Sequence, residues 1–312
     1  MTSPRPAPLT MSTTDWLLLI GLSILWGGSF YFAKVAVLEI PPLTLAFGRV
    51  TIAAMCLVIL ARAAVGPFAH GRTTWWDFTV IAALNNALPF ALIFWGQIHI
   101  SIGLASILNA TSPLFTVVVA HWATQDDKLT PGRAIGLIAG FIGVVVLIGP
   151  DLLADFSSYV LAEIALLVAA LSYACGAIYA RRLKAMPPVT IACGQLTMAS
   201  ILLAPFVLVV DGPWTLSAVS GAPIWAMVAL AVFCTALAYL MYFRVLSRAG
   251  ATNALLVTFL IPVSAILLGI VLLEETIEPR QLAGMAAIAI GLATIDGRPA
   301  RYLARIVGRT NS

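Results

Sequence analysis

The chain has 312 residues, of which 61% are hydrophobic and only 10% are charged, and its formal net charge at pH 7 is +4. Soluble domains carry about 25% charged residues, so this composition excludes a soluble globular enzyme or binding module and indicates a protein that contacts the lipid bilayer. The small positive charge comes from scattered loop residues and not from a basic patch, which argues against nucleic acid as a partner.

The apolar residues form long runs separated by turn-forming clusters. Residues 1–15 are polar and Pro-rich and are expected to be a disordered cytoplasmic N-terminus, and residues 298–312 a basic cytoplasmic tail. A bilayer core about 30 Å thick needs about 20 apolar residues in a helix. This measure predicts an all-α membrane protein with ten transmembrane helices, at 16–37, 42–64, 75–97, 102–122, 131–149, 159–180, 190–209, 222–246, 253–273 and 280–296.

The basic residues predict the orientation of these helices. Cytoplasmic loops of membrane proteins carry an excess of Lys and Arg. With ten spans both termini share one side, and that side receives 14 of the 17 Lys and Arg residues, all except Lys34, Arg49 and Arg280. Both termini are therefore expected to be cytoplasmic.

The sequence contains an internal repeat. Residues 46–53 read AFGRVTIA and residues 192–199 read ACGQLTMA, while NALPFALIFW at 86–95 aligns with TALAYLMYFR at 235–244. Helices 1–5 thus correspond to helices 6–10.

The two copies are expected to be inverted, because each has an odd number of spans. The first five-helix repeat covers 16–155 and the second covers 156–297. Inverted repeats are typical of transporters, in which a site near the bilayer midplane opens alternately to each side. A duplicated scaffold without a cavity is the alternative.

Several loose motifs occur in the same order in both copies, and their order and duplication resemble the EamA-type branch of the drug/metabolite transporter superfamily. They are the stretch from Trp26 to Lys34, the Pro-then-Arg pattern of helix 2, the SPLF of helix 4, and an acidic residue nine positions before a helix Gly (Asp127 to Gly136, Glu275 to Gly284). Asp127 departs from the pattern, because the family usually has Glu there.

The resemblance covers essentially the whole chain and is greatest to the ten-helix YddG-type amino-acid exporters. It implies a multi-pass protein of the bacterial cell inner membrane.

Polar residues within the apolar segments lie at mirrored positions. Asn86 and Phe90 are four residues apart, hence on one helix face, and their mirrors are Thr235 and Tyr239. Proline in a span frees the carbonyl four residues earlier, so we expect free acceptors near residues 85, 109 and 258, and helix bends at Pro89, Pro113 and Pro262. The predicted substrate-binding residues are Trp26, Phe30, Asn86, Phe90, Asn109, Ser112, Tyr173, Thr235, Tyr239 and Thr258. The alternative is that Asn and Thr only join helices by hydrogen bonds.

Two basic residues inside the apolar segments have two interpretations each. Arg49 is either an anion site or the partner of a rim acid such as Glu39 or Glu275, with the second interpretation favoured. Lys34 is either a snorkelling anchor or a gate partner. Because the nearest acid, Glu163, lies near a helix end, no coupling carboxylate is expected in mid-membrane.

The sequence therefore favours a secondary transporter, not an enzyme, that exports aromatic and other neutral amino acids and related small metabolites by facilitated diffusion. No cofactor or metal site is expected, and the chain should be a monomer or a weak homodimer. The alternatives are a carrier of an anionic or sugar-linked metabolite or drug, and a membrane enzyme or scaffold. An enzyme should carry a cluster of titratable residues at one bilayer face, and the sequence contains none.

Overall fold

The computed structural model describes residues 11–65, 71–125, 128–148, 158–212, 219–254 and 256–296. All regular elements within these ranges are helical, as the composition predicts. Asp127 and the predicted C-terminal tail lie outside the described residues, as do residues 1–10 of the predicted N-terminal segment.

The first half of the chain folds into seven α-helices joined by short connections. They are α1 (Thr13–Ala36), α2 (Pro42–Val65), α3 (Arg72–Ala82), α4 (Leu88–His99), α5 (Ile102–Asn109), α6 (Ser112–Ala123) and α7 (Pro131–Ile148). A π-helical segment, η1 (Ala83–Ala87), connects α3 to α4 without a loop. The predicted start of the first helix at residue 16 is three residues late, because Ser12 and Asp15 form a capping box that starts α1 at Thr13.

The second half repeats this order. Its α-helices are α9 (Ser158–Ala180), α10 (Pro188–Phe206), α11 (Gly221–Ala231), α12 (Ala238–Ala249), α13 (Ala251–Ala254), α14 (Val257–Leu273) and α15 (Pro279–Asp296), with the shorter helices η2 (Arg181–Leu183), η3 (Val207–Asp211) and η5 (Val232–Leu237). The π segment η5 links α11 to α12 at the position that mirrors η1. A π-helix adds a residue to a turn and is frequent at functional sites.

Eight helical stretches of the described chain are long and apolar enough to cross a membrane. They include the combined stretches Thr73–His99 and Gly221–Ala249, each of which continues through a π segment. The other two predicted spans correspond to the shorter apolar helix Val257–Leu273 and to α15, which are not among these eight stretches.

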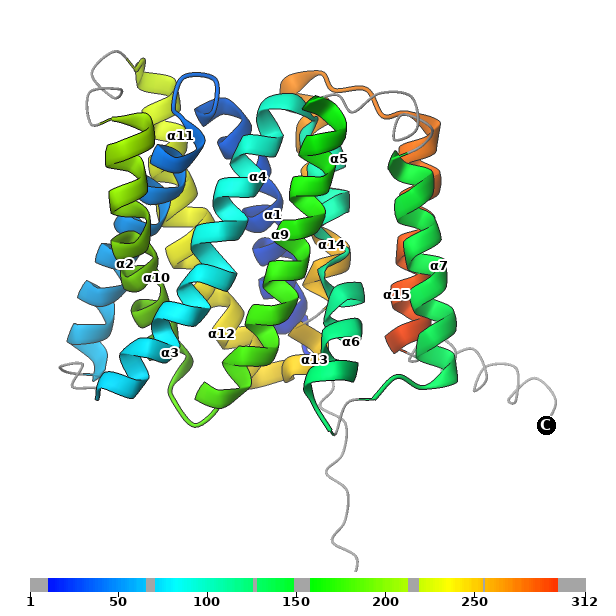
Figure 1. Ribbon diagram of the computed structural model, residues 1–312, viewed down its shortest axis with the longest axis horizontal. Coiled ribbons are helices and arrows are strands. Elements are labelled where there is room, and N and C mark those ends of the chain that lie inside the picture. Colours follow the sequence, from blue (N-terminus) through cyan, green and yellow to red (C-terminus); the bar gives the residue numbers. More distant parts are fainter. Residues whose placement is uncertain are drawn as a thin grey trace, which may run out of the picture.

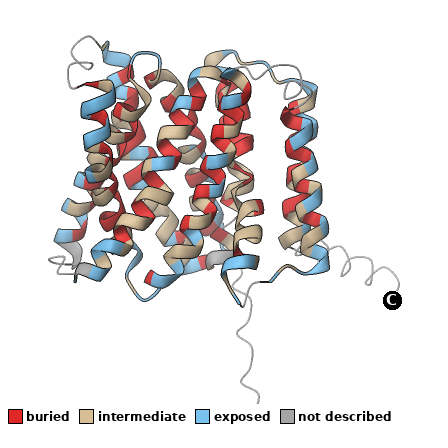
Figure 2. Ribbon diagram, viewed as in Figure 1, coloured by how far each residue is buried: buried red, intermediate tan, exposed pale blue. Residues whose placement is uncertain are grey.

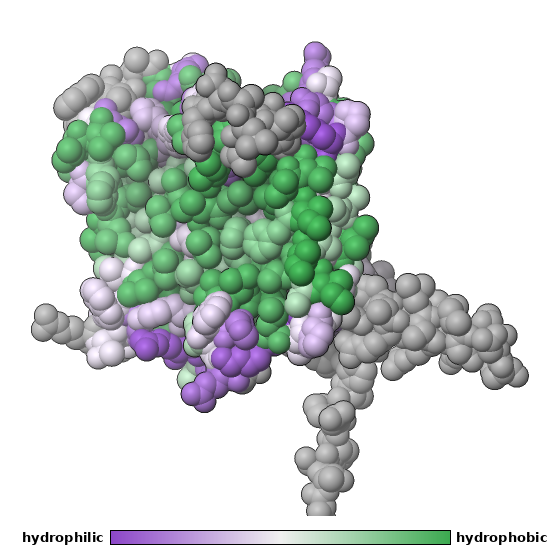
Figure 3. All heavy atoms as spheres, turned by 45° about the vertical axis from the view of Figure 1, so that its right-hand side comes forward, coloured by the Kyte–Doolittle hydropathy of each residue, from purple (hydrophilic) through white to green (hydrophobic). Residues whose placement is uncertain are grey.

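The outer surface agrees with a lipid environment. Large apolar side chains such as Ile59, Val145 and Val271 are about 70% exposed. Figure 3 shows hydrophobic residues in a broad band across the face in view, with hydrophilic residues near its upper and lower ends. In Figure 2 the buried residues face the interior of the bundle. A band of this kind is what a bilayer-spanning protein presents to lipid.

Helices from opposite halves pack against each other in corresponding pairs. Helix α1 packs on α14 and α12, and correspondingly α9 packs on α6 and α4. Helix α2 packs on α10, and α7 packs on α15 at the right of Figure 1. We call α1, α12 and α14 the α1 group, and α9, α3–α4 and α5–α6 the α9 group. Helix α1 begins and α15 ends at the same lower face of Figure 1.

Glycines hold α7 and α15 in close contact. A Cβ atom on Gly136 would lie 2.6 Å from the carbonyl oxygen of Gly291, and one on Gly143 would lie 2.8 Å from that of Gly284. The contacts are reciprocal, because a Cβ on Gly291 or Gly284 would meet the carbonyl of its partner as closely. Small residues therefore let these two helices of the same chain approach closely.

Candidate functional site

A cavity of about 710 Å³ lies between the α1 group and the α9 group. Its wall is mainly apolar and aromatic, with Arg49 and several amides and hydroxyls among the lining residues. The cavity is partly open, and it extends from Gln97 near the end of α4 to Arg133 and Asp296 at the opposite ends of the bundle helices. This volume and lining are typical of small-molecule sites.

Most of the residues predicted from the sequence line this single cavity. They are Trp26, Phe30, Arg49, Phe90, Asn109, Ser112, Pro113, Tyr173, Thr235, Tyr239 and Thr258. Four predicted residues are absent from the lining, namely Lys34, Asn86, Pro89 and Pro262. The structure therefore brings the mirrored positions of both halves together, while their role in binding stays a prediction.

Asn85 lines the cavity in place of Asn86. Asn86 is fully buried and does not line the cavity. The prediction placed Asn86 and Phe90 on one face by α-helical spacing. The π segment η1 changes that spacing, because residues i and i+5 align in a π turn. Asn85 and Phe90 are five apart and share the cavity face.

The freed carbonyls predicted at two of the prolines are occupied by hydroxyl groups. Ser172 of α9 donates its hydroxyl to the carbonyl oxygen of Leu84 at 2.8 Å, and Ser112 donates to that of Asn109 at 2.7 Å. Hydroxyls commonly satisfy backbone groups that proline leaves open in membrane helices. The carbonyls of Leu84, next to predicted position 85, and of Asn109 thus each accept one hydroxyl, and each keeps a second lone pair. Their role as substrate acceptors stays a prediction.

Arg49 lies on α2 with 7% of its surface exposed, and it contacts both halves of the chain. Its Nε donates to Oγ1 of Thr235 at 2.9 Å. Its guanidinium carbon lies 3.9 Å from the ring centroid of Phe90 and 5.8 Å from that of Phe94. The Thr235 hydroxyl in turn donates to the carbonyl of Leu230, as the π turn of η5 allows. The guanidinium is thus held by the hydrogen bond from its Nε to Thr235 and by its contact with the Phe90 ring.

The predicted pairing of Arg49 with a rim acid is wrong. Glu39 accepts from the backbone N–H and the hydroxyl of Ser220, and Glu275 accepts from the backbone of α5. Neither carboxylate reaches Arg49, because both lie at the ends of helices. Within the described part of the chain, Arg49 makes no ion pair.

An unpaired guanidinium at this depth is energetically costly. Taking a charge out of water costs several kcal/mol after relaxation. The contact with the Phe90 ring offsets about 1–2 kcal/mol, and the single hydrogen bond to Thr235 offsets about 1.5–3 kcal/mol. The terminal nitrogens Nη1 and Nη2 donate to no described residue. They are left for water or for an anionic group in the cavity.

The cavity is closed at the Gln97 end by contacts between α1 and α4. Lys34 donates to the carbonyl oxygens of Gln97 at 2.6 Å and Ile100 at 2.9 Å. The Gln97 side chain returns a hydrogen bond to the carbonyl of Phe30 at 2.8 Å. Lysine near a helix C-terminus also interacts favourably with the helix dipole. Lys34 therefore joins two helices and does not extend along the outer surface.

Glu275 adds a second link at this end. Its carboxylate accepts from the backbone N–H groups of Ile102 at 2.9 Å and Gly103 at 3.3 Å, at the N-terminus of α5. A carboxylate is stabilising there because the helix N-terminus carries partial positive charge. The void beside Glu275 is only about 10 Å³, which is no larger than a water site. The contact joins the connection after α14 to the first half of the chain.

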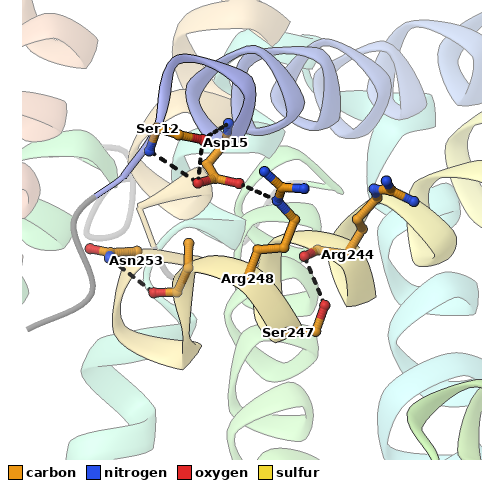
Figure 4. A network of polar contacts seen from close by, with 7 residues as sticks. Ser12, Asp15, Arg244, Ser247, Arg248 and Asn253 are labelled. Carbon is orange, nitrogen blue, oxygen red and sulfur yellow. Dashed lines mark hydrogen bonds and ion pairs between the residues drawn. The ribbon is translucent and has the colours of Figure 1, made fainter. Parts of the chain in front are cut away.

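Two polar links at the opposite end each lie within one group. Asp15 of α1 accepts from Nε of Arg248 on α12 at 2.8 Å, inside the α1 group. Figure 4 shows this carboxylate between Ser12 and Arg248. In the α9 group, the Tyr179 hydroxyl donates to Asp77 at 2.7 Å. These contacts tie each group internally, and Arg133 and Asp296 line the cavity at this end.

Sequence reasoning missed several lining residues, of which Gln97, Phe94 and Ser29 carry the clearest signals. Phe90, Phe94 and Gln97 recur at i, i+4 and i+7, which places them on one helix face. Ser29 lies within one helical turn of both Trp26 and Phe30. The same periodicity that selected Phe90 would have found them.

These features define a polytopic helical membrane protein with one internal, partly open cavity shared by its two halves. The model of the EamA-like transporter family matches residues 15–149 and again 160–295. The chain therefore belongs to the EamA-like transporter family, and the two matches confirm a duplication.

Relatives of similar length carry transporter names. The chain is 29% identical to the uncharacterized transporter YvbV of Bacillus subtilis, over 95% of this chain and 96% of that protein. It is 26% identical to a probable amino-acid metabolite efflux pump of Salmonella typhimurium, over 96% of this chain and 100% of that protein. A solved crystal structure with 20% identity and a TM-score of 0.64 covers 95% of this chain and 99% of its own, which shows the same fold.

Proposed function

We propose that this protein is a secondary transporter of the bacterial inner membrane that exports amino acids, aromatic and other neutral ones, and related small metabolites. The observation that carries the proposal is one substrate-sized, partly open cavity, shared by both halves, with contacts that bridge the two helix groups at its Gln97 end. A cavity between two groups of helices can open alternately to either side if the groups rock against each other. The name of the Salmonella relative supports amino acids as the substrate class.

The open end faces the cytoplasm in this proposal. Arg133 and Arg248 lie at that end, on the side that the distribution of basic residues predicts to be cytoplasmic. An inward-open cavity is the state in which an exporter takes up its substrate. Two inverted five-helix repeats with ten spans, at 16–155 and 156–297, provide the symmetry that exchanges this state with an outward-open one.

The lining favours facilitated diffusion. Among the described lining residues the only carboxylate is Asp296, at the mouth. Glu163 is buried in α9 outside the lining. Proton relays and ion sites within membranes are built from carboxylates or histidines that face the pathway. A substrate gradient alone is therefore expected to drive export.

The test is transport by purified protein in liposomes, with a panel of radiolabelled amino acids and no imposed ion gradient. We expect downhill flux of aromatic and other neutral amino acids. Asn85→Leu and Thr235→Val should each reduce flux without loss of folded protein, whereas Met55→Leu, on the exposed outer face of α2, serves as the control. Flux of no amino acid in either direction would refute the proposal.

A carrier of anionic metabolites is the second candidate, because Arg49 faces the cavity without a carboxylate partner among the described residues. Flux of sugar phosphates in preference to amino acids in the same liposomes would favour it. The enzyme alternative has less support, since the family and the relatives carry transporter names.

A further inference from the structure

Arg49 is the one strongly charged side chain of the described cavity wall that lies away from the mouth. Nine-tenths of its surface is buried, and it lines the cavity together with Phe90 and Thr235. The other charged lining residues, Arg133 and Asp296, lie at helix ends. The interior of the cavity therefore carries a positive charge that no described carboxylate neutralises.

The contacts of Arg49 hold the guanidinium in a fixed orientation. Nε is bound by the Thr235 hydroxyl at 2.9 Å, and the plane lies over the Phe90 ring, whose centroid is 3.9 Å from the guanidinium carbon. Thr235 is held by its own hydrogen bond to Leu230. Fixing one nitrogen leaves the terminal pair as a planar fork, the geometry that binds a carboxylate through two parallel hydrogen bonds.

A second polar residue of the cavity wall has an unused acceptor. Asn109, at the end of α5, lines the cavity, and its buried Oδ1 accepts no hydrogen bond from any described residue. A buried acceptor without a donor is costly, and a ligand ammonium or amide N–H would satisfy it. The remaining wall is aromatic and apolar, which suits a neutral side chain.

We propose that Arg49 is the receptor for an ionised carboxylate of the substrate, so that the cavity selects small monocarboxylates, including zwitterionic amino acids, and rejects amines and amides that lack this group. This inference rests on the proposed function and names its recognition element. A single deep guanidinium matches a singly charged carboxylate better than a phosphate dianion, which would recruit further basic residues.

Binding to purified protein tests the inference independently of transport. The probes are phenylalanine, 3-phenylpropionate, phenylalaninamide and phenethylamine, titrated by isothermal calorimetry in detergent. The wild-type protein should bind the two carboxylates roughly ten- to hundredfold more tightly than the two compounds without one, as expected for hydrogen bonds to charged groups. Arg49→Gln should remove this preference, and Arg49→Lys should restore part of it.

The matched control is Arg62→Gln, which removes an exposed arginine from the last turn of the same helix and should leave all four affinities unchanged. Size-exclusion profiles and thermal midpoints confirm that each variant is folded. If wild-type protein binds neither carboxylate, or if folded Arg49→Gln keeps the carboxylate preference, the inference is wrong.

Liposome flux separates this inference from the proposed function. Carboxylate binding that depends on Arg49, without flux of any amino acid, would refute the transport proposal alone. Amino-acid flux that persists in Arg49→Gln with the same preference for carboxylates would refute the inference alone. Preferred binding of phenyl phosphate over 3-phenylpropionate would also overturn it, because the site would then recognise a dianion.

Discussion

The two ends of the cavity differ in which helices their polar contacts join. At the Gln97 end, Lys34 links α1 to α4 and Glu275 links the connection after α14 to α5, so both contacts bridge the α1 group and the α9 group. At the Arg133 end, the ion pair of Asp15 with Arg248 stays within one group. Bridging contacts close an end, whereas contacts within a group stiffen it as a unit. Opening the Gln97 end therefore requires these bridges to break, whereas the contacts at the other end can persist.

The largest effect is expected from Lys34→Met, which removes both hydrogen bonds from Lys34 to α4. Each bond to a charged group contributes about 1.5–3 kcal/mol, so the open population at this end should rise at least tenfold. A cysteine at Ser29, in protein whose four native cysteines are replaced by alanine, should react about ten times faster with a membrane-impermeant maleimide added to whole cells.

Lys128→Met is the matched control, since Lys128 donates to the carbonyl of His121 at the opposite end. An unchanged labelling rate in the Lys34 variant would show that Lys34 does not hold this end closed.

The next effect concerns the rigidity of the α1 group. A Cβ atom on Gly27 would lie 2.3 Å from Oγ of Ser264 and 2.8 Å from the backbone nitrogen of Ala265, so Gly27→Ala forces α1 and α14 apart. Overpacking of this kind costs about 1–3 kcal/mol, and the thermal midpoint in detergent should fall. Gly28→Ala is the control, because its Cβ would have no neighbour closer than 3.8 Å. Equal midpoints for the two variants would contradict the close approach.

Glu275→Gln should have a smaller effect at the Gln97 end. Glutamine keeps one acceptor for α5 but loses the charge at the helix N-terminus, which contributes about 1 kcal/mol. The cysteine at position 29 should label a few times faster than in the parent protein. Glu278→Gln, on the same connection and paired with Arg280, should leave the rate unchanged. Faster labelling in the Glu278 variant than in the Glu275 variant would argue against a role of the contact between Glu275 and the N-terminus of α5 in holding this end closed.

The smallest effect is a pH dependence at Glu39, which is exposed beside the closed end. Hydrogen bonds from the backbone N–H and hydroxyl of Ser220 hold the pKa of Glu39 below its ordinary value of 4.5. A lowered pKa stabilises the folded state above pH 4.5 and loses that contribution as the pH falls through the lowered pKa. Between pH 6 and pH 3 the thermal midpoint of wild type should fall slightly more than that of Glu39→Gln, and parallel curves would exclude the contact.

The helical class, the duplication and the apolar segments followed from composition and periodicity, because lipid contact demands long runs of apolar residues whatever their tertiary arrangement. Most of the residues predicted for the site also line the cavity, although they make up fewer than half of its wall. The sequence predicted Asn86 in the cavity wall, whereas the structure places Asn85 there. The π turn that decides it depends on Pro89 and on the hydroxyl of Ser172, a residue of a distant helix.

What the sequence determined by itself is the set of helices, their pairing into two related halves and the residue types available for a site. Only the tertiary structure decided that Arg49 faces the cavity and does not pair with an acid at the end of a helix. The carboxylates of Glu39 and Glu275 instead accept hydrogen bonds from backbone N–H groups that are remote in sequence. It also decided which end is closed. Both outcomes depend on distances between helices, and the pattern of a single chain does not contain those distances.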